Sequence, residues 1–247
     1  MEPGDDLAVM IGDALVRCGE VPEGGDVLVV AQKIVSKAEG RYVDLSTIEP
    51  SAEARALATA VGKDPRLVEV ILRQSTEVVR YRPGVLIVAH RLGLVLANAG
   101  VDQSNIEPAG EATGEDGGAD RVLLLPEDPD RSASRLRAAL GARFDAELGV
   151  VINDSLGRAW RQGTVGVAIG AAGIPALEDL RGAPDLFGRQ LRVTEVGTGD
   201  QLAAAAALLQ GQADEGRPVV LVRGFCGRGP ARPATSLVRA KELDLFR

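Results

Sequence analysis

ELGVVINDSLGRAWRQGTVGVAIGAAG, residues 147–173, holds two apolar runs on either side of a polar centre. The first run, ELGVVINDS (147–155), is predicted to be a strand that ends in polar groups. The second, GTVGVAIGAAG (163–173), is predicted to be a strand studded with glycines. Sites tend to form where a rigid sheet holds the polar residues that follow its strands. This stretch therefore predicts a sheet with a candidate site at one end.

Helices and further strands are predicted on both sides of this stretch, from apolar residues at helical spacing and from apolar runs bounded by turn residues. The predicted helices cover residues 4–19, 51–63, 65–75, 128–144 (with Ser132 or Asp130 near its start) and 199–212. The other predicted strands cover residues 26–36, 121–126, 191–196 and 217–225, with two more inside 82–100 joined by a turn near 90–93. Strands and helices do not alternate strictly, so the pattern favours α+β, or a mixed α/β sheet, over a doubly wound Rossmann fold.

The composition of the chain argues against several classes of function. A chain of 247 residues is one large domain or two small ones. A net charge of −7 and only 3% aromatic residues argue against binding of nucleic acid. Every apolar run is shorter than ten residues, so no membrane span is expected. The two cysteines form no CxxC, and a reducing cytoplasm is the expected location.

Two segments stand apart from the regular pattern. Residues 107–120 are rich in glycine, alanine and acid, and are predicted to be a long flexible loop. The tail, residues 227–247, begins rich in proline and glycine and ends amphipathic. Its apolar residues are expected to pack against the core or a second subunit: Leu237, Val238, Leu243, Leu245 and Phe246.

Polar groups follow predicted strands in three places, AQKIVSK (31–37), NAGVDQSN (98–105) and INDSLGRAWRQG (152–163). The last two each supply an aspartate, Asp102 and Asp154, although a single aspartate after a strand is more often a turn cap than a ligand. Asp154 and Ser155 precede Arg158 and Arg161, and a carboxylate, a hydroxyl and two guanidiniums suit Mg²⁺ and phosphate together. If a helix begins after Gly157, the two arginines share one face of it.

Lys33 and Lys37 lie four residues apart and could add charge to the same phosphates. The alternative is a solvated basic face, which is the more frequent role of a surface lysine.

Several familiar catalytic motifs are absent from the sequence. There is no GxxxxGK[ST], so the chain is not a P-loop nucleotidase. Gly166, Gly170 and Gly173 do not form GxGxxG, which argues against a dinucleotide site. The single histidine, His90, is expected to be structural or exposed. The GxSxG motif is also absent, so the sequence does not indicate the nucleophilic serine of a hydrolase triad.

Four segments together resemble the coenzyme F420-0:L-glutamate ligase family, also called F420-0:gamma-glutamyl ligase. They are VVAQKIVSKAEGR, ANAGVDQSN, INDSLGRAWRQGTVGVAIGAAGIPALEDLRG and the ending RAKELDLFR. The resemblance runs from about residue 4 to residue 247. It implies the family's own α+β fold, an intertwined homodimer, and a GTP- and metal-dependent amide ligase that adds L-glutamate to F420-0, with further gamma-linked glutamates to follow.

The resemblance also implies roles for individual residues. One divalent cation, Mg²⁺ or Mn²⁺, is expected at Asp102 and Asp154, and a second at Ser155 and Gln212, with K⁺ as a further candidate. The nucleotide contacts are expected from Gln32, Lys33, Lys37, Asn105, Gln210, Gly211, Gln212, Ala213, Asp214, Glu215, Gly216 and Arg217. Arg158 and Arg161 are the candidates for the acceptor's phosphodiester.

The boundaries of the ligase are also set by the resemblance. Residues 1–247 are expected to be a single ligase unit, with two lobes as the alternative, and without the nitroreductase-like C-terminal domain that some relatives carry. Family members usually have an extra strand and a Leu-Pro turn before the first helix, which contact the nucleotide. The present sequence begins at MEPGDDL, so that contact is expected to be missing or made differently.

Two alternatives to the ligase remain open from the sequence. One is a non-catalytic relative that binds nucleotide or metal. The presence of Asp102, Asp154 and Gln212 argues against this alternative. The other is a phosphotransferase that acts on another small acid. It would use the same metals and phosphates but form no amide.

Overall fold

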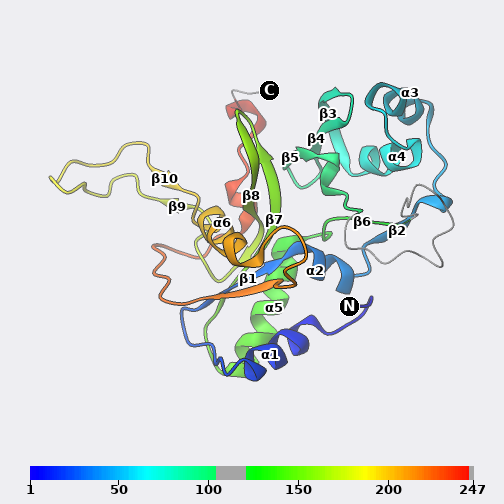
Figure 1. Ribbon diagram of the computed structural model, residues 1–247. Helices are drawn as coiled ribbons and strands as arrows, with labels where there is room; N and C mark the ends of the chain where they lie inside the picture. The colour runs from blue at the N-terminus through cyan, green and yellow to red at the C-terminus, as the bar shows by residue number, and fades with distance from the viewer. Residues whose placement is uncertain (104–120, 245–247) are drawn as a thin grey trace. The chain divides into compact units, whose positions relative to one another are not determined.

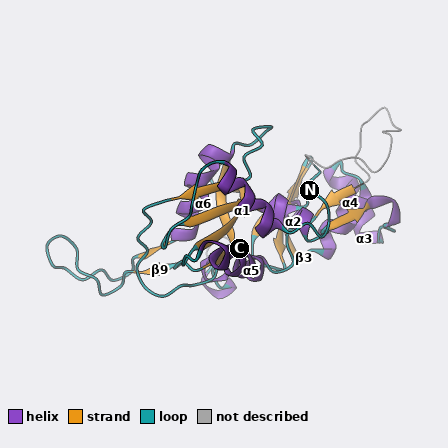
Figure 2. Cartoon of the chain, turned by 90° about the horizontal axis from the view of Figure 1, so that it is seen from below, coloured by secondary structure: helices purple, strands orange, loops and turns teal. Residues whose placement is uncertain are grey.

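Strands and helices form two units in the computed structural model, which describes residues 1–103 and 121–244 (Figure 2). The first unit comprises residues 1–4, 36–126 and 244–247, and the second comprises residues 5–35 and 127–243. Each unit combines sheets and helices, which confirms the predicted mixed α+β class. No helix within the described ranges is both long and apolar enough to span a membrane.

A four-stranded sheet is the centre of the second unit, in the order β11-β1-β7-β8. Its strands are β1 (Val27–Ala31), β7 (Gly149–Arg158), β8 (Arg161–Ala172) and β11 (Val219–Val222). β1 runs parallel to β7 and antiparallel to β11, and β7 and β8 form an antiparallel hairpin. The first four residues of β1 are fully buried, as expected of a strand that is covered on both faces.

Two helices, α5 (Pro129–Phe144) and α6 (Thr198–Gln210), pack against β8, and α1 (Leu7–Arg17) packs against α5 (Figure 1). The close approach of α5 and α6 depends on glycines in β8. A Cβ atom at Gly166 would lie 2.3 Å from the Ala203 carbonyl oxygen in α6, and one at Gly170 would lie 2.4 Å from the Pro129 carbonyl oxygen in α5. The register shift next to Ile152 leaves one extra residue in β8, so these two glycines face opposite sides of the sheet.

We predict that Gly166→Ala lowers the free energy of unfolding by about 1–3 kcal/mol, because the new methyl group meets backbone that cannot move aside cheaply. Gly157→Ala in the same hairpin is the control, since a Cβ atom there meets nothing within 4 Å. Chemical denaturation of both variants is the measurement. Equal stability of the two variants would contradict this account of the packing.

The first unit is built on a three-stranded antiparallel sheet and two helices. The sheet has the order β3-β4-β5, and β2 pairs with β6 in a separate ribbon. The strands are β2 (Tyr42–Asp44), β3 (Ser75–Arg82), β4 (Val85–His90), β5 (Val95–Ala97) and β6 (Arg121–Leu123), and the helices are α3 (Ala52–Val61) and α4 (Pro65–Arg73). Residues from all these helices, from β4 and from β6 share one apolar core.

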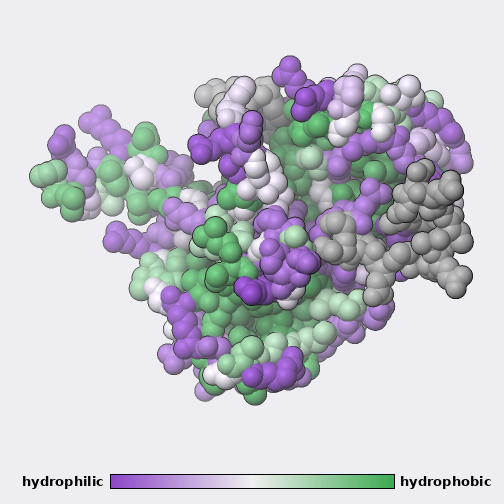
Figure 3. Space-filling model, in the orientation of Figure 1, coloured by the Kyte–Doolittle hydropathy of each residue, from purple (hydrophilic) through white to green (hydrophobic). Residues whose placement is uncertain are grey.

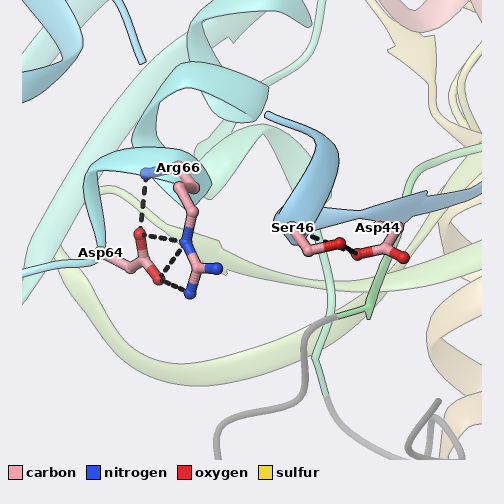
Figure 4. Close-up of polar contacts among 4 residues, drawn as sticks. All are labelled: Asp44, Ser46, Asp64 and Arg66. Carbon is pink, nitrogen blue, oxygen red and sulfur yellow. Dashed lines mark hydrogen bonds and ion pairs between the residues drawn. The ribbon is translucent and has the colours of Figure 1, made fainter. Parts of the chain in front are cut away.

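Side-chain caps fix where the helices of the first unit begin. Ser51 accepts the Ala54 N–H at the start of α3. Asp64 accepts the Arg66 N–H at 2.8 Å and also binds the Arg66 guanidinium, which holds the pKa of Asp64 below its usual value (Figure 4). Asp44 similarly accepts the N–H and hydroxyl of Ser46, at the start of the 3₁₀ helix Leu45–Thr47 (Figure 4). Such caps satisfy N–H groups that a helix start leaves without a partner.

His90 is buried at the end of β4, with 2% of its surface exposed. Its Nδ1 accepts the Leu92 N–H at 3.0 Å. Burial, with a smaller contribution from the charges of Arg91 and Arg41, lowers the pKa of His90 to about 4. The imidazole therefore stays neutral near pH 7 and supports a turn, which is the structural one of the two roles expected for it.

Several element boundaries differ from the sequence prediction. The strand predicted over 26–36 ends at Ala31, and helix α2 (Gln32–Ala38) follows it. The strand predicted over 191–196 shrinks to β10 (Glu195–Val196), which pairs with β9 (Glu178–Asp179). Strands β2 and β3 were not predicted.

The start of α5 agrees with the prediction, because Asp130 and Ser132 both lie near it, and Asp128 is the residue that caps the helix. The Asp130 carboxylate accepts the N–H groups of Ala171 and Ala234, which ties the C-terminal segment to β8. The predicted flexible loop at 107–120 lies outside the described residues.

The C-terminal segment forms two 3₁₀ turns, Ala234–Leu237 and Lys241–Leu243. Leu237 packs against the core of the second unit, as expected for the tail, whereas Leu243 is 66% exposed. Leu245 and Phe246 lie outside the described residues.

Candidate functional site

The polar residues of the second unit gather at one edge of its sheet. Ala31, the last residue of β1, pairs with Asn153 in the parallel strand β7, so Gln32 and Asp154 come next at the same edge. The antiparallel strand β11 enters from this edge, where the Ala31 N–H donates to the Pro218 carbonyl at 2.8 Å. Three segments that are distant in sequence therefore meet: the start of α2, the middle of β7, and residues 211–217 before β11.

Helix α2 carries the predicted nucleotide contacts Gln32, Lys33 and Lys37. Gln32 is buried, with 3% of its surface exposed, and the two lysines are half-buried. Residues four apart on a helix lie on the same face, so Lys33 and Lys37 project from one side of α2. The sequence had predicted a strand here, and the helix gives the two lysines a common direction.

Asp154 and Ser155 lie within β7, not beyond its end, because the strand continues to Arg158. Asp154 is half-buried and its Oδ1 accepts the Ser155 N–H at 2.8 Å. Successive side chains of a strand point to opposite faces. Ser155 pairs with Gly166, which faces α6, so Ser155 lies on the α6 side of the sheet and Asp154 on the other.

Arg158 and Arg161 do not share a helix face, and the helix expected after Gly157 is wrong. The two arginines pair across the β7–β8 hairpin, as the last residue of one strand and the first of the next. Both are exposed, with Ala159 and Trp160 forming the turn between them. The hairpin therefore brings the two arginines opposite each other at the tip of a ribbon, rather than on one helix face.

The side-chain amide of Gln210, a predicted nucleotide contact, forms hydrogen bonds with other residues of the protein. Asn153 Nδ2 donates to Gln210 Oε1 at 2.7 Å, and Gln210 Nε2 donates to Asn153 Oδ1 at 3.2 Å and to the Pro218 carbonyl at 3.4 Å. This amide pair joins the end of α6 to β7 and to the start of β11. Sequence reasoning missed it, and also missed Asn153 as a site residue.

Residues 211–217 form an exposed loop whose backbone binds a carboxylate. The Glu215 carboxylate accepts the Ala213 N–H at 2.9 Å. The N–H groups of Ala213, Glu215 and Gln212 lower the pKa of Glu215. Gly211 has φ +74°, and a Cβ atom there would lie 2.0 Å from the Glu215 carboxyl carbon, so glycine is required where the loop leaves α6. Consecutive N–H groups arranged in this way suit an anion.

Asp102 and Lys37 belong to the first unit, and the other described candidates belong to the second. Asp102 is half-buried and exchanges two backbone hydrogen bonds with Leu123, both at 2.9 Å. The three residues of the preceding 3₁₀ turn, Asn98–Gly100, all have φ values between 52° and 65°. Left-handed backbone at non-glycine residues is costly and is often found at functional sites. Asn105 lies outside the described residues.

Oxygen donors are the groups that these segments offer to a cation. Within residues 1–103 and 121–244, no three His, Cys, Asp or Glu side chains gather as a metal site. The candidate ligands are instead one carboxylate in each unit, Asp102 and Asp154, together with the exposed Ser155 and Gln212. Oxygen ligands of this kind fit Mg²⁺ or Mn²⁺ and do not fit a soft metal.

Comparison with known proteins places the chain in a family. The model of the F420-0:Gamma-glutamyl ligase family matches residues 1–224. The chain belongs to this family. A relative from Methanopyrus kandleri, named coenzyme F420:L-glutamate ligase, is 48% identical over 252 residues, which cover 100% of this chain and 93% of the relative. Relatives of the same name from Methanothermobacter thermautotrophicus and Methanocaldococcus jannaschii are 45% and 43% identical, covering 93% and 86% of their lengths.

We predict that the Asn153–Gln210 pair is energetically coupled. Asn153→Ala and Gln210→Ala should each lower the free energy of unfolding by about 1–3 kcal/mol, because each leaves a buried amide without its partner. The double variant should lose less than the sum of the two, with a coupling of about 0.5–3 kcal/mol. Denaturation of the four proteins in the cycle measures this coupling. Simple additivity would show that the two amides act separately.

Proposed function

We propose that this protein joins the amino group of L-glutamate to the carboxylate of coenzyme F420-0 and consumes GTP. The observation that carries the proposal is the sheet edge where α2, β7 and residues 211–217 meet, in a chain of this family. The names of its relatives, which span nearly the whole chain, support the acceptor and the amino acid.

The sheet edge offers two features that suit GTP phosphates. Lys33 and Lys37 supply point charges from one side of α2. The N–H groups of the 211–217 loop bind the Glu215 carboxylate. Phosphate oxygens also accept hydrogen bonds from such N–H groups. The Gln210 side chain holds the loop in place, since its amide is bound to Asn153.

Two divalent cations, Mg²⁺ or Mn²⁺, are proposed to serve the reaction. Asp102 and Asp154 would hold one, and Ser155 and Gln212 the other, with K⁺ as a further candidate. Ser155 lies on the α6 side of the sheet, from which the loop carrying Gln212 departs, and Asp154 lies on the opposite side. When bound, such cations neutralise the charge of the phosphates during transfer.

The proposed chemistry needs no nucleophilic side chain. A carboxylate is a poor electrophile, so an oxygen of the F420-0 carboxylate first attacks the γ-phosphorus of GTP, and GDP leaves. The product is an acyl phosphate with a good leaving group. The neutral amine of L-glutamate then attacks the acyl carbon and loses a proton, and phosphate leaves as the amide forms. The chain's task is to position the reactants and to neutralise charge. Repetition on the new glutamate carboxylate would add further gamma-linked residues.

Arg158 and Arg161 are proposed to receive the anionic acceptor. A chain of net charge −7 must provide a local positive site for a ligand that carries a phosphodiester and a carboxylate. The hairpin tip offers such a site, because the two arginines pair across the strands and are exposed.

We predict that the purified protein with GTP, Mg²⁺ or Mn²⁺, F420-0 and L-glutamate yields glutamylated F420-0, detected by mass. Asp154→Asn should reduce turnover by at least about 100-fold, since a neutral amide replaces the proposed carboxylate ligand of the cation that neutralises phosphate charge. The control is Asp13→Asn, which removes a half-exposed surface carboxylate paired with Arg143. GDP release without an amide product would indicate a phosphotransferase, and nucleotide binding without turnover would indicate a non-catalytic relative.

A homodimer is also proposed, on the evidence of an apolar arm between β9 and β10. Residues 180–194 extend away from the rest of the second unit (Figure 1). Leu186 is 99% exposed and Phe187 84% exposed, and Figure 3 shows apolar surface at the end of this arm. Large exposed apolar groups of this kind mark contact surfaces, and a second copy in a symmetric pair would cover both arms.

Light scattering at micromolar concentration is expected to give twice the chain mass, and Phe187→Ser with Leu186→Ser should shift the protein toward the monomer. A monomeric wild-type protein would contradict the dimer.

A further inference from the structure

Trp160, at the tip of the β7–β8 hairpin, is an unusual residue for its position. It is the only tryptophan of the chain and is 87% exposed. Its φ is +64°, in the left-handed region that bulky side chains rarely adopt. Glycine would fill such a turn position without strain. A large aromatic side chain that is mostly exposed and held in a costly backbone conformation indicates a functional role.

The charges around Trp160 indicate the chemistry of its ligand. Arg158 and Arg161 flank the turn and pair across the two strands, so an arginine stands on each side of the turn that carries Trp160. An aromatic side chain offers a stacking surface to a planar ring, and arginines bind phosphate oxygens. The ligand that fits this tip is therefore a planar aromatic ring system that carries a phosphate group.

We propose that Trp160 stacks on the deazaflavin ring of the acceptor while Arg158 and Arg161 hold its phosphodiester. This proposal rests on the proposed function. The geometry of β7 separates this tip from the nucleotide, because Arg158 lies four residues beyond Asp154, about 13 Å along an extended strand at 3.3 Å per residue. The ring and the reacting carboxylate lie at opposite ends of the acceptor with the phosphodiester between them, so the ring can rest on the tip while the arginine side chains reach toward the sheet edge to hold the phosphodiester.

A fluorescence titration of the full-length protein tests this directly, because all tryptophan emission comes from Trp160. F420-0 is added with Mg²⁺ and without GTP, and N-acetyltryptophanamide in a parallel titration corrects for light absorbed by the ligand. Saturable quenching of the protein signal is expected. Quenching by GTP and not by F420-0 would overturn the proposal, since the tip would then bind the base. Emission that depends on protein concentration and does not respond to F420-0 would also overturn it, because a second copy would cover the ring.

Substitutions of Trp160 distinguish a loss of ring stacking from a loss of folding. The anisotropy of the deazaflavin's own fluorescence measures affinity in proteins that lack Trp160. Trp160→Gly should weaken F420-0 binding by about 10-fold or more, within the range found for loss of one aromatic stack, and should not lower the unfolding temperature, because it relieves the left-handed strain. Trp160→Phe keeps a ring and should stay within about 3-fold of wild type. Tyr81→Ala, which removes a half-exposed ring of β3, is the matched control and should leave affinity unchanged.

Affinity for F420-0 that is unchanged in Trp160→Gly would overturn the stacking role and leave the ligase proposal intact. A wild-type protein that fails to bind F420-0 would overturn the stacking role as well. In that case the glutamylation assay on the same preparation shows whether the proposed function fails with it.

Discussion

The hydrogen-bond ladder on both sides of β1 is the constraint on which the candidate site depends. Val27 to Val30 are fully buried and pair with β7 on one side and β11 on the other. A slip of one residue would move each of their side chains to the wrong face, so the register is strongly fixed. That register places Ala31 beside Asn153 and Pro218, so the start of α2, the middle of β7 and residues 211–217 meet at this edge as the candidate site.

Much of the fold could be predicted from local pattern, and the errors have physical causes. The helices with strong periodicity, such as 51–63 and 65–75, lie where the spacing placed them. Helix α2 was missed because the apolar Ile34 and Val35 follow the apolar run of β1 after only two polar residues, and a seven-residue helix depends on its surroundings more than on propensity. Strand β3 is mostly exposed and shows little apolar alternation, so only its pairing with β4 defines it.

The segments that form the candidate site could be predicted from the sequence, but the way their side chains lie relative to one another could not. Asp154, Lys33 and the 210–217 segment were recognisable in the sequence, and the sheet brings them to one edge. The Asn153–Gln210 pair spans 57 residues and has no local signal. The positive φ of Trp160 likewise could not be predicted from the sequence, because tryptophan is not a residue type that favours positive φ. These non-local features decide which side chains face a ligand.

We propose that GTP and its cations bind where α2, β7 and the 211–217 loop meet. A crystal structure with a non-hydrolysable GTP analogue and Mn²⁺, with Mn²⁺ located by its anomalous scattering, tests this proposal. We expect a manganese peak within about 2.6 Å of a carboxylate oxygen of Asp154. We also expect triphosphate density against the N–H groups of residues 211–217. Manganese away from Asp154, or a nucleotide bound elsewhere on the chain, would contradict the proposal.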